Sequence, residues 1–186
     1  MAESVDFIFE RANSALITQD FQYAERLLTN VLKKHPDISP EDKEKIESLL
    51  ARIYGDEGDL ERSMAAYLRL YARYPNNTDL MINLGRIYRH LARYEEALHI
   101  LEKAQRIGGD TDEVLYNLAK TYKRMHNYEK AAEYFSRAIQ IKPDHAHAYD
   151  RLGNLYSLTG ETDKAIETYK NGLRMDPNHP YLNFHL

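Results

Sequence analysis

Residues Asp112–His145 read DEVLYNLAKTYKRMHNYEKAAEYFSRAIQIKPDH, and the same order of residue types recurs at intervals of 34 residues. Segments that begin at Glu44, Thr78, Asp112 and Ala146 align with one another without a gap. Counted within a segment, column 11 is tyrosine and column 7 is leucine in all four, whereas columns 8 and 20 hold only Ala, Gly or Ser. Matching columns in unbroken register indicate an internal repeat, and a repeat of this length is typical of a stacked array.

The spacing within one segment predicts two helices. Columns 4, 7, 8 and 11 form one helical stripe, and columns 20, 24 and 27 form a second stripe. Turn residues such as Gly58-Asp59 and Gly160-Glu161 stand between the stripes. Each segment is therefore expected to fold as a helical hairpin whose apolar stripe is buried only when hairpins stack. The predicted fold class is all-α, an α-solenoid of stacked antiparallel helix hairpins.

A fifth, divergent segment precedes the four. From a start at Val5, the run Phe21–Leu28 fits the second half of the pattern, whereas Arg11 and Ala15 occupy the leucine and tyrosine columns. Five extra residues, Ser39–Lys43, separate this segment from the next. The predicted organisation is a tail (1–4), a divergent repeat (5–38), an inserted linker (39–43), four repeats (44–77, 78–111, 112–145 and 146–179) and the start of a terminal helix (180–186), either a cap or a truncated helix.

Composition excludes several classes of protein. The 186 residues carry a net charge of −4, which argues against a general nucleic-acid binder. Because the chain has no cysteine, disulfides and thiolate ligands are excluded. No apolar run approaches the ~20 residues that cross a bilayer, and the first residues lack the features of a secretory signal. We therefore expect a cytoplasmic protein without a membrane span.

The repeat resembles the tetratricopeptide repeat family, whose 34-residue unit carries bulky, Leu-Gly, Tyr, Ala, aromatic, Ala and Pro positions. In 112–145 the matching residues are Leu115, Leu118, Ala119, Tyr122, Ala131, Phe135, Ala138 and Pro143. In 146–179 they are Tyr149, Leu152, Gly153, Tyr156, Ala165, Tyr169 and Pro177. Departures are Glu47, Ser63 and Gly109. The resemblance implies a right-handed superhelix with a concave groove lined by the first helix of each repeat, and a protein that binds other proteins or peptides.

Motifs for catalysis are not found in the sequence. There is no Gly-x-Ser-x-Gly and no glycine-rich phosphate loop. His145 and His147, with Asp144 and Asp150 nearby, are the one local group with metal-ligand chemistry. A zinc site needs three or four converging ligands, and this group straddles a turn, so we expect solvated histidines and neither a metal nor another cofactor.

The candidate binding residues are those on first helices that face away from the shared core. These columns carry eight Lys or Arg against four Asp or Glu in the four strong repeats, which favours an acidic partner segment. Asn83 and Asn117 are expected to hold the backbone of an extended peptide, and Tyr116 to supply an apolar contact. The predicted groove set is Arg52, Asn83, Arg86, Arg89, Tyr116, Asn117, Lys120, Lys123, Arg124, Arg151 and Asn154.

The carboxylate clamp of chaperone-tail receptors in the family is not predicted. Asn117 and Arg151 match two of its five positions, but Ile82, Arg86 and His147 occupy the other three. The sequence therefore favours acidic ligands in general over that particular tail.

Two functions remain open from the sequence. The first is a non-enzymatic scaffold or adaptor that holds a partner protein's segment in the groove. The alternative is the regulatory or substrate-selecting array of a larger enzyme. A nucleic-acid-binding solenoid is disfavoured, since Tyr116 is the main groove aromatic that could stack on a base. Apolar terminal residues also predict weak self-association through the ends: Phe7, Ile8, Phe9, Tyr181, Leu182, Phe184 and Leu186.

Overall fold

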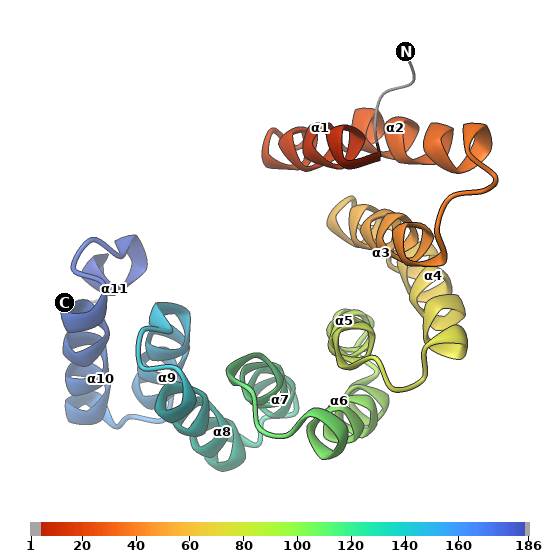
Figure 1. The fold of residues 1–186 in the computed structure, drawn as a ribbon. Coiled ribbons are helices and arrows are strands. Elements are labelled where there is room, and N and C mark those ends of the chain that lie inside the picture. Colours follow the sequence, from red (N-terminus) through yellow and green to blue (C-terminus); the bar gives the residue numbers. More distant parts are fainter. Residues whose placement is uncertain (1–4, 185–186) are drawn as a thin grey trace. The chain divides into compact units, whose positions relative to one another are not determined.

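The computed structural model describes the backbone of residues 5–184, and all of its regular elements in that range are helices (Figure 1). The chain divides into two compact units, unit 1 (residues 1–91) and unit 2 (residues 92–186). The predicted tail, residues 1–4, lies outside the described residues, as do Leu186 and the side chains of Tyr181 and Phe184. No helix within residues 5–184 combines the length and the apolar character needed to cross a membrane.

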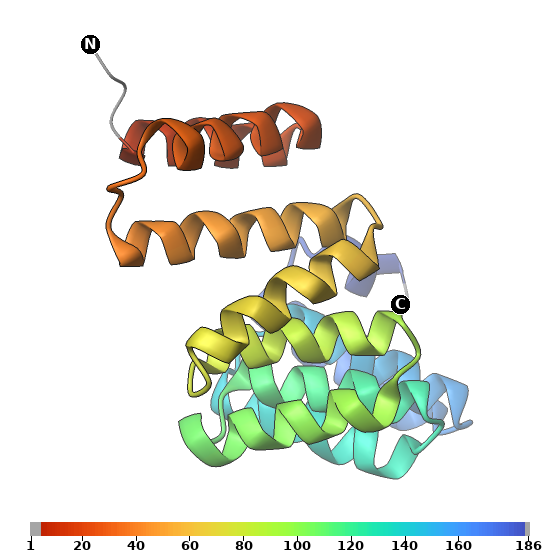
Figure 2. The ribbon, with the colours of Figure 1, turned by 90° about the vertical axis from the view of Figure 1, so that its right-hand side faces the viewer.

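The described part of unit 1, residues 5–91, contains five helices. They are α1 (Val5–Ile17), α2 (Phe21–Lys34), α3 (Pro40–Asp56), α4 (Leu60–Arg73) and α5 (Thr78–His90). Figure 2 shows α1 and α2 side by side in one layer, with α3 in the next. Small residues let the first hairpin close, because Ala12 and Ala24 are fully buried between α1 and α2. Leu28, Ile46 and Ile53 complete a core shared by this hairpin and α3.

Residues 92–184, the described part of unit 2, contain six helices. They are α6 (Tyr94–Gly108), α7 (Asp112–Arg124), α8 (Tyr128–Ile141), α9 (Ala146–Leu158), α10 (Thr162–Met175) and the short α11 (Pro180–Phe184). Ala119, Ala131 and Phe135 are fully buried and form a core with Leu152 and Leu155 of the next hairpin. Within both units, each second helix also packs against the following first helix, which is the stacking that defines an α-solenoid.

The side chains at the turns explain where several helices begin. Asp20, Asp59 and Asn127 occupy the same position in three hairpins, and each side-chain oxygen accepts a hydrogen bond from the backbone N–H three residues later. Thr111 does the same for the N–H of Val114 at 3.2 Å. Such caps satisfy donors that the first turn of a helix leaves without a partner.

The inserted residues 39–43 do not form an irregular linker. Ser39 caps α3 by accepting the backbone N–H of Asp42 at 3.0 Å, and Pro40 opens the helix. Proline suits this position because its fixed φ is helical and its missing N–H has no partner to lose. The insertion therefore lengthens α3 by one turn at its N-terminal end.

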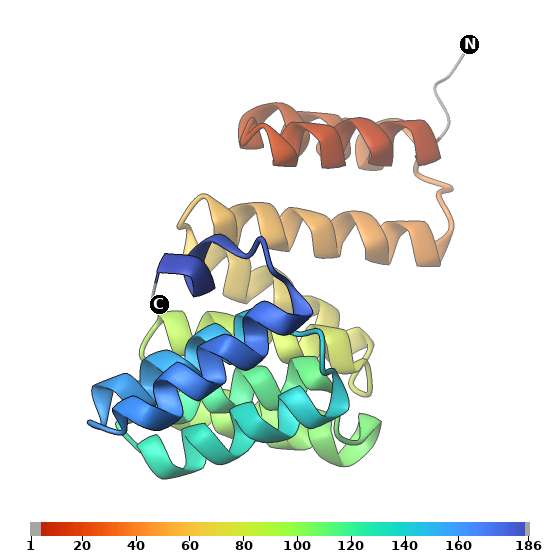
Figure 3. The same ribbon diagram turned by 90° about the vertical axis from the view of Figure 1, so that its left-hand side faces the viewer.

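The terminal apolar residues are covered more fully than the sequence analysis expected. Leu182 is fully buried and joins a core with Tyr149, Ala165 and Tyr169, while Ile8 is 8% exposed. Figure 3 shows α11 turning back after α10. Phe7 is 47% exposed. Leu182 of α11 therefore packs against α9 and α10, and Ile8 joins the core of the first hairpin, so these two side chains are not left uncovered. Weak self-association through the ends stays a prediction.

Candidate functional site

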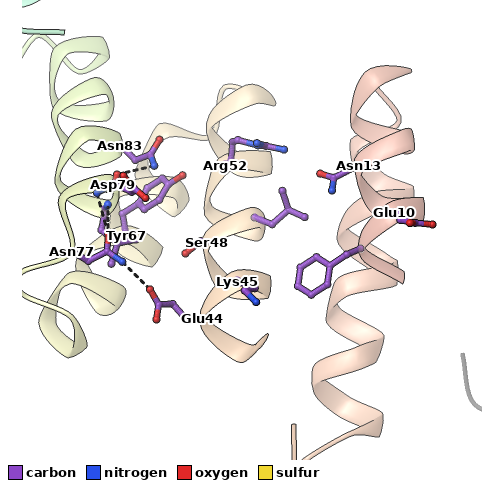
Figure 4. Close-up of a pocket in the computed structure, with 13 residues that line it drawn as sticks. Glu10, Asn13, Glu44, Lys45, Ser48, Arg52, Tyr67, Asn77, Asp79 and Asn83 are labelled. Carbon is purple, nitrogen blue, oxygen red and sulfur yellow. Dashed lines mark hydrogen bonds between the residues drawn. The ribbon is translucent and has the colours of Figure 1, made fainter. Parts of the chain in front are cut away.

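A hollow with a volume of about 650 Å³ lies along the first helices of unit 1 (Figure 4). We call it the unit 1 hollow. Its lining residues come from α1 (Phe9, Glu10, Asn13), α3 (Glu44, Lys45, Ser48, Leu49, Arg52), α4 (Tyr67) and the start of α5 (Asn77, Asp79, Leu80, Asn83). Two predicted groove residues, Arg52 and Asn83, are among them. Its volume falls within the range of about 300–1,000 Å³ that is typical of ligand sites.

The unit 1 hollow combines apolar and polar surfaces. Phe9, Leu49 and Leu80 supply apolar atoms from three different helices. At the end nearest the start of α5, the Asn77 amide donates a hydrogen bond to Glu44 Oε1 at 3.0 Å. Lys45, on the same turn of α3 as Glu44, pairs with Glu41 at 3.0 Å. At this end of the hollow, Lys45 is thus paired with a carboxylate, and the Glu44 carboxylate accepts a hydrogen bond from a neutral amide.

Tyr67 reaches the unit 1 hollow from the second helix of its hairpin. The residue is 1% exposed, and Figure 4 shows its ring extending from α4 towards the space between α3 and α5. Burial raises the pKa of the Tyr67 hydroxyl, and the nearby positive charges of Arg86 and Arg52 oppose that shift. Sequence reasoning placed Tyr67 in the core, since column 24 belongs to the buried stripe. The column pattern of the repeat does not indicate that the side chain of Tyr67 also lines a cavity.

Asn83 and Asn117 occupy equivalent positions in successive repeats and make equivalent bonds. The Asn83 amide donates to the carbonyl of Asp79 at 2.9 Å, and the Asn117 amide donates to the carbonyl of Glu113 at 2.9 Å. Both side chains thus bond to their own helix. Asn83 is half-buried and lines the hollow, whereas Asn117 is only 7% exposed.

The predicted groove residues of unit 2 fall into two groups. In the first, Tyr116 packs against Phe135 and His145, with ring centroids 5.6 and 4.9 Å apart. The Lys120 ammonium lies 5.1 Å from the centre of the Tyr116 ring, within cation–π range. The Tyr116 ring is therefore half-buried, with the Lys120 ammonium over it, and the exposed part of the ring is apolar.

The second group surrounds Asp150, a carboxylate that is 3% exposed. Arg151 Nε lies 3.6 Å from Asp150 Oδ2, and the Asn154 amide donates to Asp150 Oδ1 at 2.9 Å. Asn154 Oδ1 in turn accepts the Tyr169 hydroxyl at 3.1 Å. Burial lowers the pKa of Lys123, and the positive charge of Arg151 lowers it further while Asp150 opposes the change.

Arg89 and Asn117 do not have the exposure expected of groove residues. Arg89 is 5% exposed and Asn117 is 7% exposed. Both side chains lie deeper than the column pattern indicates, because that pattern gives the face of a helix but not how closely neighbouring residues pack around it. Their role in binding a partner stays a prediction. The other predicted residues are half-buried or exposed: Arg52, Asn83 and Arg86 in unit 1, and Tyr116, Lys120, Lys123, Arg124, Arg151 and Asn154 in unit 2.

The histidines with possible metal-ligand chemistry point to separate neighbours. His145 Nε2 lies 3.9 Å from Asp112, and its ring contacts Tyr116. His147 instead meets His179 edge to face at 5.1 Å. Within residues 5–184, no three His, Asp or Glu side chains come together as a set that could hold a metal ion.

One recurring contact was missed by the sequence analysis. Cationic side chains at column 19 cover the column 11 tyrosines in three repeats. The pairs are Arg62 with Tyr54 (3.9 Å), Lys130 with Tyr122 (5.0 Å) and Lys164 with Tyr156 (5.5 Å), measured to the ring centres. The sequence does contain the signal for this contact, a basic residue eight positions after the tyrosine. Because a cation of the protein itself covers one face of each of these rings, that face needs no stacked nucleic-acid base to explain it.

Comparisons with known proteins agree with this architecture. The chain is 20% identical to TTC0263, described as a thermophilic TPR protein of Thermus thermophilus, with a TM-score of 0.83 over 97% of this chain and 96% of that one. It is 18% identical to pilF of Pseudomonas aeruginosa, with a TM-score of 0.76 over 97% and 80% of the two chains. YrrB, described as a TPR protein with an unusual peptide-binding site, is 16% identical, with a TM-score of 0.64 over 95% and 89%. At these identities the likeness concerns the fold alone.

Sequence comparison identifies the repeats themselves. No curated protein sequence matches the chain. A family model of the tetratricopeptide repeat matches residues 78–144 and 110–178, and a second model of the same repeat matches residues 48–77. These matches cover more than half of the chain, and the helix hairpins described above occupy the matched ranges. The chain therefore belongs to the tetratricopeptide repeat family.

Proposed function

We propose that this protein is a non-enzymatic interaction module that binds a segment of a partner protein, preferably an acidic segment, along the faces of its first helices. Tetratricopeptide repeats are generally interaction modules that do not catalyse reactions. The observation that carries the proposal is the unit 1 hollow, since α1, α3 and α5 line a space of about 650 Å³ with apolar and polar groups. The peptide-binding site ascribed to YrrB gives further support to a peptide ligand.

The acidic preference rests on the cations of unit 2. Lys120, Lys123 and Arg151 are half-buried or exposed. Burial lowers the pKa of Lys123, and repulsion from the positive charge of Arg151 lowers it further. A bound carboxylate would relieve that repulsion and raise the Lys123 pKa again. Such a surface also attracts anionic chains before contact, which speeds their association at low salt.

A peptide array tests the proposal with a charge-reversed variant. Acidic, neutral and basic peptides of equal length are scored against the wild type and against Lys120→Glu combined with Arg151→Glu, at low and moderate salt. We expect acidic peptides to bind best, and the variant to lose at least about tenfold in affinity, with a larger difference at low salt.

The matched control reverses two exposed cations on a second helix of the same unit. Lys170→Glu combined with Arg174→Glu changes the net charge equally but leaves the first helices untouched. This control is expected to retain the affinity of the wild type. Equal binding of neutral and acidic peptides, or equal losses in both variants, would contradict an acidic ligand on the first-helix face.

A further inference from the structure

A second hollow lies within unit 2, at the end where the chain turns from first to second helices. The start of α8, the last turn of α9 and the start of α10 line it, and Figure 1 shows α9 beside both of the other two helices. Its volume is about 420 Å³, within the range of about 300–1,000 Å³ that is typical of ligand sites. We call it the unit 2 hollow. None of its lining residues belongs to the predicted groove set.

The sequence explains why space opens at this point. Ala132 lines the hollow at column 21, where the two preceding repeats carry Met64 and Leu98. Thr159 lines it at column 14, where the preceding repeat carries Met125. Because packed helices otherwise fill the space between them, these two smaller side chains leave room at the boundary between two hairpins.

The walls of the unit 2 hollow are aliphatic and aromatic. Ala132 and Leu155 supply aliphatic atoms, and Tyr128 and Tyr156 are half-buried tyrosines. The Tyr128 hydroxyl lies 2.8 Å from Nδ1 of His126, which engages the polar end of this side chain. Such walls suit a long side chain that is apolar along its stem and polar at its end.

One carboxylate at the hollow has no partner in the described part of the chain. Glu161 Oε2 pairs with Lys164 at 2.5 Å, and Glu161 Oε1 accepts the Thr159 hydroxyl at 3.0 Å. The Lys164 ammonium also lies 5.5 Å from the centre of the Tyr156 ring. The Glu129 carboxylate, by contrast, makes neither an ion pair nor a hydrogen bond with residues 5–184. With two carboxylates against one ammonium, the lining favours an incoming cation.

Unit 1 shows how this place in a repeat holds a guanidinium. Arg62 stands at column 19, as Lys164 does, and its guanidinium lies 3.9 Å from the centre of the Tyr54 ring. The same guanidinium pairs at 3.0 Å with Glu25 of the preceding hairpin. Glu25 occupies the column of Ala132, so the alanine both removes that carboxylate and widens the space in unit 2.

We propose that the unit 2 hollow binds an arginine side chain of a partner protein. The guanidinium pairs with Glu129 and lies against Tyr128, and the stem packs on Ala132. Arginine suits the site better than lysine, because a planar guanidinium stacks on a ring and matches both oxygens of a carboxylate. The proposal goes beyond the proposed function, since it assigns a basic residue of a partner to a surface apart from the predicted groove.

The test titrates the intact chain with three blocked tripeptides. N-acetyl-Ala-Arg-Ala-amide is compared with its citrulline analogue, which has almost the same shape without the charge, and with its lysine analogue. The readout is the NMR signal of the Ala132 methyl group. We expect a saturable shift with the arginine peptide, about three- to tenfold weaker binding of the citrulline peptide, and about two- to threefold weaker binding of the lysine peptide.

Variants of two lining residues assign the effect to the hollow. Glu129→Gln should weaken binding of the arginine peptide by about two- to fivefold, and Glu129→Lys by about tenfold or more. Ala132→Leu introduces the residue type found at this column in Leu98, fills the hollow and should weaken binding by more than about tenfold. Glu167→Gln, at an exposed glutamate of α10 that does not line the hollow, is the matched control and should bind as the wild type does.

The outcomes decide both the chemistry and the place. Equal binding of the arginine and citrulline peptides, or full affinity in the two Glu129 variants, would overturn the proposal. A lysine peptide that binds as tightly as the arginine peptide would overturn the choice of arginine. Full affinity in Ala132→Leu would overturn the place, and if that variant fails to fold, the Glu129 variants decide.

The charge-reversed variant of the proposed function separates the two surfaces. Lys120→Glu combined with Arg151→Glu should bind the arginine peptide at least as well as the wild type does, because it changes no residue that lines the hollow. A loss of binding in this variant would place the arginine peptide on the first-helix face and overturn the proposal.

Discussion

The ring of Tyr169 packs so closely on Gly153 that a Cβ built on the glycine would lie 2.3 Å from ring carbon Cε1. Gly153 belongs to α9 and Tyr169 to α10, so the contact brings the two helices of one hairpin together. Ring carbons Cδ1 and Cζ would lie 2.6 and 2.8 Å from the same position. The face of a buried ring cannot give way as the end of a flexible side chain can, so the helices must separate if Gly153 gains a side chain.

We therefore expect Gly153→Ala to destabilise the protein by about 1–3 kcal/mol, the usual cost of overpacking. Gly153→Leu should cost more. The measurement is urea unfolding followed by circular dichroism. Ser157→Ala, on the exposed face of the same helix, is the control and should stay within about 0.5 kcal/mol of the wild type. Unchanged unfolding of Gly153→Ala would show that the helices are not in contact at this point.

Gly55 and Ser63 give a second prediction because they are coupled. Ser63 is fully buried, and its hydroxyl donates to the carbonyl of Ala51 at 2.7 Å. A Cβ on Gly55 would lie 3.1 Å from Ser63 Oγ. Removing the hydroxyl should therefore relieve the closer of two tight contacts, the other being with Ile87 Cδ1 at 3.3 Å.

A double-mutant cycle measures this coupling. Ser63→Ala alone should cost about 0.5–1.5 kcal/mol through the lost hydrogen bond. Gly55→Ala should be more favourable in the Ser63→Ala background than in the wild type, because alanine is the better helix former by about 1 kcal/mol once the contact is relieved. Strict additivity of the two changes would contradict the contact.

Arg62 links three helices and gives a third prediction. Its guanidinium lies 3.9 Å from the centre of the Tyr54 ring and 3.0 Å from Glu25 Oε1. Because all of these groups are partly exposed, we expect Arg62→Gln to cost only about 1 kcal/mol. The coupling between Arg62→Gln and Tyr54→Leu, measured by thermal unfolding, should be about 0.5–1 kcal/mol. Arg69→Gln serves as the comparison, and a coupling of zero would mean that the ring contact contributes nothing.

His145 predicts a dependence of stability on pH. Burial lowers the pKa of His145 below the ordinary value, and Asp112 only partly opposes this effect. The unfolded state then binds more protons than the folded state in the window just below about pH 6.5, so stability falls as pH falls through that window. Comparing urea unfolding at pH 8 and pH 5 for the wild type and His145→Gln isolates the contribution, because the variant should lose less stability. An equal loss in both proteins would assign the effect to other groups.

The fold was predictable because its determinants are local and repeated. Leu118, Ala119 and Phe135 stand at columns that the spacing assigns to a buried stripe, and all three are fully buried. The insertion before α3 was predicted to be a linker, although Ser39 and Pro40 are a recognisable helix start. These two residues predict that the helix begins at Pro40, before the first column of the repeat at Glu44.

The candidate site was only partly predictable from the sequence. Arg52 and Asn83 line a real hollow, but Arg89 is buried, and Tyr67 was not expected at the site. Helical periodicity gives the direction of a side chain from its own axis. It does not say how far a ring from α4 extends between α3 and α5, which depends on the sizes of the residues packed around it.

Within residues 5–184, five of the connections between consecutive helices contain one residue with a positive φ in the left-handed region. Gly58 and Gly160 adopt it at φ 88° and 82°, whereas Gln19, Ala92 and His126 adopt it at φ 59°, 58° and 60°. For a residue with a side chain this conformation costs about 1–2 kcal/mol. These three residues are exposed, so glycine could replace each of them without removing a buried contact. Glycine at these three positions is therefore expected to raise the thermal stability of the protein without changing the residues that line the unit 1 hollow.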